Sequence, residues 1–164
     1  MSITTIVFLS AVIVFVLLAL VARFKWKNLY LDTLQMNEGE TVLFNDEKVK
    51  VELRAGTGVD VLPGAYVRVT DSRIIIAQKV LGREKYIIKY IIHHWGDPVP
   101  EGPGGGSFNT GYITYRTTPQ KISINDEDRS PIVRIEPLEK GIGIPAWLHI
   151  KTADPGQYRR ALNI

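Results

Sequence analysis

An uncharged apolar stretch at the start of the chain constrains its fold more than any other feature. Residues Ile3 to Ala22 contain no charged side chain, and all 20 Lys and Arg and all 17 Asp and Glu residues follow them. A helix rises about 1.5 Å per residue, so a stretch of this length spans roughly 30 Å, the thickness of a bilayer's hydrocarbon core. The sequence therefore predicts a single transmembrane helix over residues 1–24.

A cleaved signal peptide is the rival interpretation of this stretch. Signal peptides begin with a basic region and carry a shorter apolar segment of about 7–15 residues. Here only Met1 and Ser2 precede the stretch, neither is basic, and Leu20-Val21-Ala22 is a poor cleavage site. A retained helix is therefore favoured.

A basic cluster directly after the stretch predicts its orientation. Arg23, Lys25 and Lys27 lie on this side, with Trp26 as an interfacial aromatic residue, and no basic residue precedes the stretch. Basic residues next to a transmembrane helix favour the cytoplasmic side. We expect the N-terminus outside the cell membrane and the rest of the chain in the cytoplasm. A topology signal is preferred over recognition of anionic lipids, which usually involves four to eight basic residues.

After the apolar stretch the sequence pattern changes. Residues 25–37 form an amphipathic connector, in which Leu29, Tyr30 and Leu34 would lie on one side of a helix. Residues 38–164 alternate between apolar and polar side chains, which is typical of half-buried strands. This part is predicted to be a mainly β domain, a small barrel or sandwich. Its strands are expected at 41–44, 48–54, 65–70, 74–77, 86–92, 112–117, 122–125, 132–136 and 146–151, with turns at 45–47, 62–64 and 70–73.

The end of the chain has the signals of a helix. Asp154 is a suitable N-cap, Pro155 fits the first helical position, and Gln157 completes a capping box. Tyr158, Ala161 and Leu162 then fall on one face. We expect a short C-terminal helix that covers an open end of the β domain.

A segment rich in glycine and proline interrupts the domain at residues 96–111. Six glycines and three prolines prevent it from packing as a helix or strand, so it is predicted to be one long loop. Part of it resembles a phosphate-binding loop but lacks the Gly-Lys-Ser/Thr ending. We interpret the loop as a candidate partner-binding segment. Its candidate contact residues are Trp95, Gly104, Gly105, Gly106 and Phe108.

Two stretches resemble the pleckstrin-homology (PH) superfold in its GRAM-like or bacterial PH-like form. They are Gly39-Glu40-Thr41-Val42-Leu43 and the run from Leu62 to Gln78, which contains Thr70-Asp71-Ser72-Arg73. The resemblance is firmest over residues 38–95. It implies about seven strands in two orthogonal sheets with one C-terminal capping helix, and a role in binding lipid or protein.

The residues do not compose an active site. The chain has no cysteine, and His93 and His94 would point to opposite faces of a strand. We therefore expect no catalytic residue, metal or cofactor, and no small-molecule substrate. A net charge of +3 without a concentrated basic stripe argues against nucleic acid.

Two functional classes remain open. In the first, which is preferred, the chain is a non-catalytic accessory subunit of a larger membrane protein complex, and its partners are other integral membrane subunits and the bilayer. In the second, it is a stand-alone tether that binds anionic lipid headgroups, a peptide or a soluble protein. The candidate lipid-binding residues are Lys79, Arg83 and Lys85, although an ordinary solvated hairpin tip is the preferred explanation for them.

Overall fold

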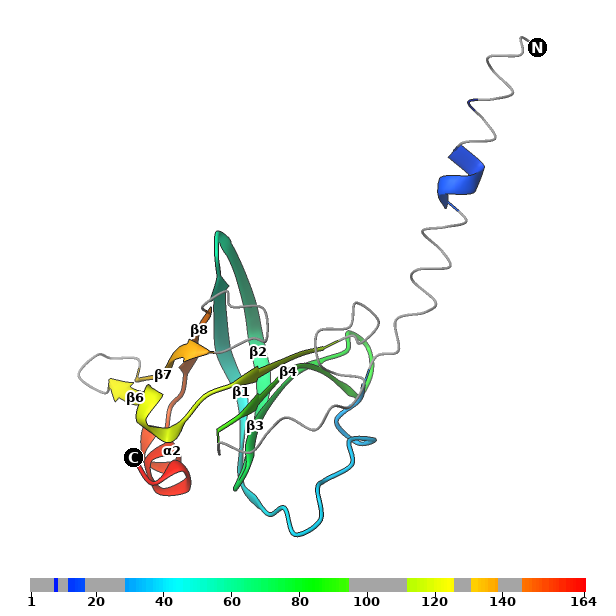
Figure 1. The fold of residues 1–164 in the computed structure, drawn as a ribbon. Coiled ribbons are helices and arrows are strands. Elements are labelled where there is room, and N and C mark those ends of the chain that lie inside the picture. The colour runs from blue at the N-terminus through cyan, green and yellow to red at the C-terminus, as the bar shows by residue number, and fades with distance from the viewer. Residues whose placement is uncertain (1–7, 9–11, 17–28, 95–111, 126–130, 139–145) are drawn as a thin grey trace.

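The computed structural model describes residues 8, 12–16, 29–94, 112–125, 131–138 and 146–164 (Figure 1). They confirm a mainly β architecture with one C-terminal helix. The strands are β1 (Val42–Ala55), β2 (Gly58–Thr70), β3 (Arg73–Lys79), β4 (Tyr86–His93), β5 (Ile113–Arg116), β6 (Ile122–Asn125), β7 (Ile132–Leu138) and β8 (Ala146–Lys151). A 3₁₀ turn, η1 (Pro119–Lys121), precedes β6, and helix α2 (Pro155–Leu162) closes the chain.

The strands form one continuous sheet in the order β5-β4-β3-β2-β1-β8-β7-β6. β1 joins two antiparallel meanders, because it pairs with β2 on one side and with β8 on the other. This order is consistent with a PH-like fold. Among the described residues this sheet has eight strands, where about seven strands in two orthogonal sheets were expected. The two expected sheets are one, because β1 pairs with both β2 and β8. β5 is the exception to the antiparallel pattern, since it runs parallel to β4 at the sheet edge.

β1 and β2 are long, bent strands where the sequence predicted turns. The expected turns at 45–47 and 62–64 are wrong: residues 45–47 pair with β2, and residues 62–64 lie inside β2, where Leu62 and Ala65 on either side of a bulge both pair with β1. The polar and Gly/Pro residues instead mark bulges: Lys48 and Gly64 have φ angles of 60° and 63°, and the register shifts beside them. A bulge bends its strand. Here the bend lies just before Lys50, where pairing between β1 and β8 begins.

The main core lies between the two halves of the bent sheet and α2. Its largest fully buried side chains include Ile74, Ile92, Leu148 and Ile150. Tyr158 and Leu162 of α2 are 0% and 1% exposed, and Ala161 packs beside them. The predicted helix and its apolar face are therefore confirmed, with Asp154 as the N-cap, accepting a hydrogen bond from the Gln157 backbone at 3.2 Å.

A second, smaller core covers the opposite face of β2, β3 and β4. Leu31 is buried there, and Leu29 and Leu34 pack against it. Residues 29–34 are not the helix that the sequence predicted: Leu31 N–H donates to Tyr86 O, and Ile88 N–H donates to Leu29 O. Since β3 and β4 are covered on both faces, their runs of isoleucine are continuous rather than alternating.

Most of the predicted transmembrane stretch lies outside the described residues. Phe8 and residues 12–16 are helical. Within the part of the chain that is described, no helix is long and apolar enough to cross a membrane. The basic cluster at Arg23, Lys25, Trp26 and Lys27 and the whole 96–111 loop also fall outside the described residues.

Candidate interaction surfaces

A buried ion pair joins the two segments that resemble the PH superfold, residues 39–43 and 62–78. Arg73 donates to Glu40 through Nε (2.8 Å) and Nη2 (2.5 Å), and the two side chains are only 7% and 1% exposed. Burial raises the pKa of Glu40. Hydrogen bonds from Arg73, Thr70 and the Asn37 backbone, together with the Arg73 charge, outweigh that effect and lower it to about 2. Glu40 therefore stays ionised, and the pair is structural.

The turn between β2 and β3 completes this junction. The Thr70 hydroxyl lies 2.7 Å from Glu40 Oε1 and accepts a hydrogen bond from the Arg73 backbone at 2.9 Å. Asp71 accepts from the Thr41 backbone, and its own N–H donates to Thr41 O. The Gly-Glu-Thr and Thr-Asp-Ser-Arg motifs are thus two halves of one contact, which explains their residues without invoking a ligand.

Helix α2 is fastened to β1 by a second polar contact. Asp46 Oδ2 accepts from the Thr152 hydroxyl (2.7 Å) and from the Tyr158 hydroxyl (3.0 Å). Burial and the Asp46 charge raise the pKa of Tyr158, so its phenol remains a donor. The Tyr158 ring also meets Phe44 edge-on at 4.7 Å. We call the region that contains this contact and the Glu40–Arg73 pair the helix end.

The paired histidines also belong to the helix end. His94 is fully buried and its Nε2 lies 3.0 Å from Thr70 O, whereas His93 is partly exposed at the end of β4. Burial lowers the pKa of both rings. In the residues that the structure describes, no group of three His, Cys, Asp or Glu side chains is placed to hold a metal ion.

The opposite end of the sheet carries two hairpin turns. β1 and β2 meet at the two-residue turn Gly56-Thr57, and β3 and β4 meet at residues 80–85. Ala65 of β2 pairs with Gln78 near the second turn, so both turns lie on the side of the sheet away from the Thr70–Arg73 turn, and β2 extends beyond this pairing to the first turn. We call this region the hairpin end. Figure 1 shows the β1–β2 turn projecting far from α2.

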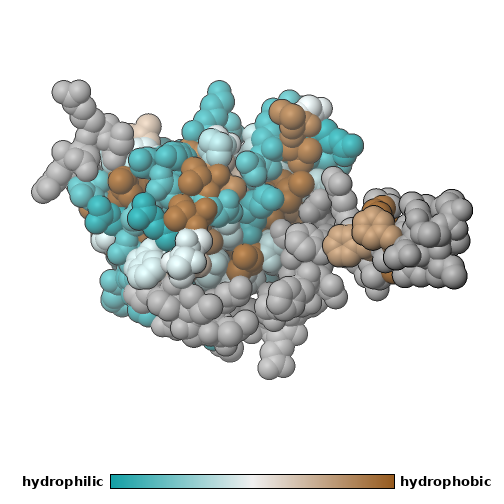
Figure 2. Space-filling model, turned by 90° about the horizontal axis from the view of Figure 1, so that it is seen from above, coloured by the Kyte–Doolittle hydropathy of each residue, from teal (hydrophilic) through white to brown (hydrophobic). Residues whose placement is uncertain are grey.

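An open groove of about 590 Å³ lies at the hairpin end, between the β1–β2 hairpin and the β4–β5 edge. Its lining is mostly apolar, and it includes Leu53, Val59, Ile113 and Tyr115. Val59 and Ile113 are 58% and 36% exposed, so apolar surface remains uncovered by described residues. Figure 2 shows such apolar patches among hydrophilic side chains on the face seen from above.

One acidic side chain marks the groove. Tyr90 donates a hydrogen bond to the Asp60 carboxylate, and both residues line the groove. Burial, this bond and the Asp60 charge raise the pKa of Tyr90, which keeps the phenol protonated. The groove therefore presents a fixed carboxylate beside an apolar wall, a combination that suits an apolar segment with one basic group.

The β3–β4 turn presents an apolar tip among charges. Leu81 is 99% exposed, and Arg83 is exposed two residues later. Lys79 pairs with Glu84 (2.8 Å), and Lys85 Nζ lies 5.5 Å from the Tyr30 ring centroid. The three candidate lipid-binding residues thus gather on one hairpin, where two of them already have local partners.

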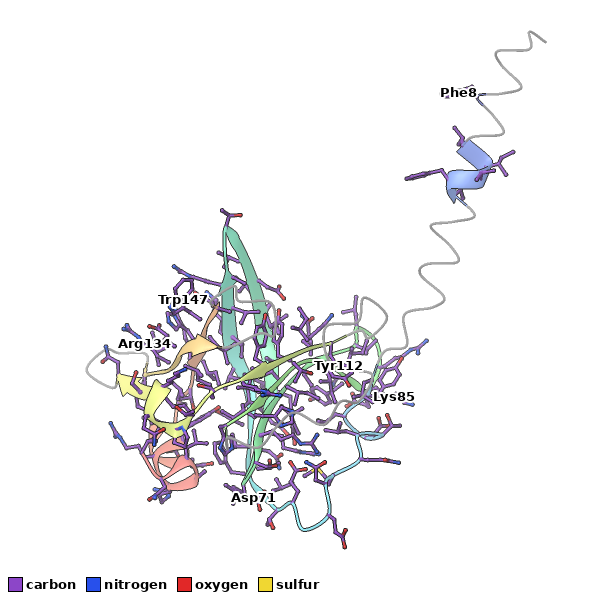
Figure 3. All side chains as sticks on the ribbon, in the orientation of Figure 1. Phe8, Asp71, Lys85, Tyr112, Arg134 and Trp147 are labelled. Atoms are coloured by element: carbon purple, nitrogen blue, oxygen red, sulfur yellow. The ribbon has the colours of Figure 1, made fainter. Side chains whose placement is uncertain are left out.

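The chain enters the domain beside this same turn. Tyr30 forms a β-bridge with Ile87, in the first part of β4. Figure 3 shows Lys85 on the side where the N-terminal segment joins the domain, and Asp71 at the helix end. The described N-terminal entry and the basic hairpin are therefore neighbours.

Sequence reasoning missed the groove and Leu81. The groove brings Asp60, Tyr90 and Tyr115 together from three strands, which the order of residues alone does not reveal. Leu81 did leave a signal, because it stands directly before Gly82 and the charged run Arg83-Glu84-Lys85, which is typical of a solvent-exposed turn and not of a core. Of the predicted partner-loop residues, Trp95, Gly104, Gly105, Gly106 and Phe108 lie outside the described residues.

Comparisons with known proteins add little. No family model and no curated protein matches the chain. Among solved structures, the Vps36 N-terminal PH domain aligns over 78% of this chain and 80% of its own, with 14% identity and a TM-score of 0.37. A likeness at that level carries no argument about fold or function.

Proposed function

We propose that the chain is a non-catalytic, single-pass membrane-anchored interaction module. Its domain would be PH-like, of the GRAM-like or bacterial form, and would serve as an accessory subunit of a membrane protein complex. One observation carries the proposal: the N-terminal entry at Tyr30, both hairpin turns and the apolar groove belong to the same end of the sheet. A chain held in a bilayer upstream of Tyr30 would present that end to its membrane neighbours.

The exposure of residues within the apolar stretch supports the proposed anchor. Val12, Ile13, Val14, Phe15 and Val16 are consecutive in a helix and are each 45–75% exposed, so no described part of the protein covers any side of it. Apolar side chains exposed all round need an apolar environment. The absence of charge from Ile3 to Ala22 and the basic cluster after it favour a bilayer, with the domain on the cytoplasmic side.

The groove gives the proposed partner a stated chemistry. An apolar segment that carries one Lys or Arg would cover Val59 and Ile113 and place its charge on Asp60. Such a segment fits the cytoplasmic border of an integral membrane subunit, where basic residues follow apolar ones. Membrane anchorage would raise the local concentration of both surfaces, so a modest contact would suffice.

Site-specific crosslinking in native membranes tests this function. The chain has no cysteine, so Val59→Cys can carry a photo-crosslinker as a unique site on the full chain. We expect one integral membrane protein to be captured, and capture to fall severalfold when Asp60→Lys is added but much less with Asp60→Asn. The matched control, Arg160→Cys on α2, should capture nothing specific. Equal capture from both sites, or capture insensitive to Asp60→Lys, would refute the groove as the partner site.

Topology is tested separately. Protease added to intact cells should spare the domain, while protease added to inverted membrane vesicles should digest it. The opposite pattern would place the domain outside and remove the proposed orientation.

A further inference from the structure

We propose that the β3–β4 turn is a second membrane contact, in which Leu81 enters the headgroup region of an anionic bilayer. Arg83 and Lys85, which follow Leu81 in the same turn, would lie against lipid phosphates. The inference rests on the proposed membrane anchor and goes beyond it, because an anchored domain need not touch the bilayer at all.

Leu81 is the strongest single indication. Its side chain is 99% exposed at the tip of a hairpin, the highest value among the described apolar side chains that are exposed. The turn does not require leucine: its positive φ lies at Gly82 (72°), and its backbone bond runs from Arg83 N–H to Val80 O. A leucine that the fold neither buries nor needs for the turn is available to an external apolar phase.

The charges around Leu81 favour a negatively charged membrane surface. Residues 79–86 contain three basic side chains, Lys79, Arg83 and Lys85, and one acidic side chain, Glu84. Lys79 and Glu84 offset each other as an ion pair. Arg83 and Lys85 therefore supply the net positive charge of the turn, which favours anionic over neutral lipid. Tyr30 and Tyr86 nearby are of the type enriched at membrane interfaces.

The position of the turn relative to the anchor makes the contact geometrically accessible. Leu31 N–H donates to Tyr86 O at 2.9 Å, so the chain joins the domain at the base of this turn. Six residues separate Ala22, the last of the apolar stretch, from Leu29, so the two are joined by seven Cα–Cα steps. Even fully extended they reach only about 25 Å. The turn is therefore confined near the membrane surface by the same segment that links it to the anchor.

A fluorescent label on a unique cysteine tests the contact. The full chain with Leu81→Cys is labelled with an environment-sensitive dye and reconstituted into vesicles of phosphatidylcholine, with or without phosphatidylglycerol. We expect blue-shifted emission, and quenching by nitroxide-bearing lipid, in the anionic vesicles. The matched control, Arg160→Cys on α2, should report an aqueous environment in both. Adding Arg83→Gln and Lys85→Gln should weaken docking of the turn by roughly fivefold for each charge removed.

The outcomes separate this inference from the proposed anchor. Flotation of every variant with the vesicles after an alkaline wash reports the anchor alone. If the chain floats but the Leu81 label stays aqueous, the hairpin contact is refuted and the anchor stands. If the label is buried equally in neutral and anionic vesicles, the proposed preference for anionic lipid is refuted. If the chain fails to float, the proposed anchor fails.

Discussion

The two ends of the sheet differ in which side chains they bury and which they expose. At the helix end, charged and hydroxyl groups are buried in pairs: Glu40 with Arg73, and Asp46 with Thr152 and Tyr158. At the hairpin end, apolar side chains such as Val59 and Leu81 are left exposed, with Asp60 beside the first. The helix end therefore buries paired polar groups, and the hairpin end carries the two most exposed large apolar side chains of the described domain, Leu81 at 99% and Val59 at 58%. Apolar side chains at the helix end, such as Leu43 and Ile164, are less exposed.

The difference separates stability from recognition. A buried polar group is costly unless its hydrogen bonds are made, so residues at the helix end are constrained by each other. An exposed leucine or valine adds little to folding and is constrained only by what binds it. Substitutions should therefore change stability at the helix end and leave it unchanged at the hairpin end.

The largest effect should come from breaking the buried ion pair. Arg73→Met leaves the Glu40 carboxylate buried without its main partner, which typically costs about 3–5 kcal/mol. The matched control is Arg54→Met, because the Arg54 side chain is 56% exposed and its ion pair is long, at 3.8 Å. Urea unfolding of the full chain in detergent, followed by circular dichroism, measures both. If both variants lose a similar free energy of unfolding, burial does not determine how much these ion pairs stabilise the fold.

Helix docking should rank next. Leu162→Asp places a carboxylate where the side chain is 1% exposed, at a cost of about 3 kcal/mol. Ile164→Asp, two residues later at a site that is 38% exposed, should change stability by less than about 0.5 kcal/mol. Thermal unfolding of the full chain reports both. If Leu162→Asp melts like the wild type, α2 is not docked as described.

A smaller effect should appear in acid. Since the folded-state pKa of Glu40 is about 2 and its ordinary value is 4.5, its contribution is fully present above pH 4.5. It should be lost as the pH falls from 4.5 toward 2, where the folded state must also take up the proton. Hydrogen bonds to a charged group suggest a loss of about 1.5–3 kcal/mol. Glu40→Gln should have a lower free energy of unfolding at neutral pH, and that free energy should change less between pH 4.5 and 2 than in the wild type. If urea unfolding shows the same pH dependence in both proteins, Glu40 is not the cause of the acid loss.

The smallest effect on stability should come from the hairpin end. Leu81→Ser and Val59→Ser remove exposed side chains, so each should change the free energy of unfolding by less than about 0.5 kcal/mol. The same variants should weaken the proposed membrane and partner contacts. A loss of more than 1 kcal/mol in either variant would mean that the side chain supports the fold, and the contrast between the two ends would fail.

The sequence predicted features that depend on neighbouring residues better than features that depend on distant ones. Alternation located most strands, and local capping rules located α2, because each depends on neighbours along the chain. The turns predicted at 45–47 and 62–64 were wrong because Asn, Asp, Pro and Gly also mark bulges inside paired strands. The connector around Leu31 was predicted to be helical, since its pairing partner Tyr86 lies far along the chain. The hairpin that carries Lys79, Arg83 and Lys85 could be predicted from the sequence, and their binding of lipid stays a prediction. The groove could not be predicted, because its lining includes residues of β1, β2, β4 and β5.

The most direct test of the account is the distance of each end from the bilayer. The full chain is labelled at single cysteines placed at Leu81 and at Arg160 on α2, and reconstituted into vesicles whose headgroups carry an energy-transfer acceptor. The account predicts strong transfer from position 81 and weak transfer from position 160. Equal transfer, or stronger transfer from position 160, would contradict the claim that the hairpin end faces the membrane.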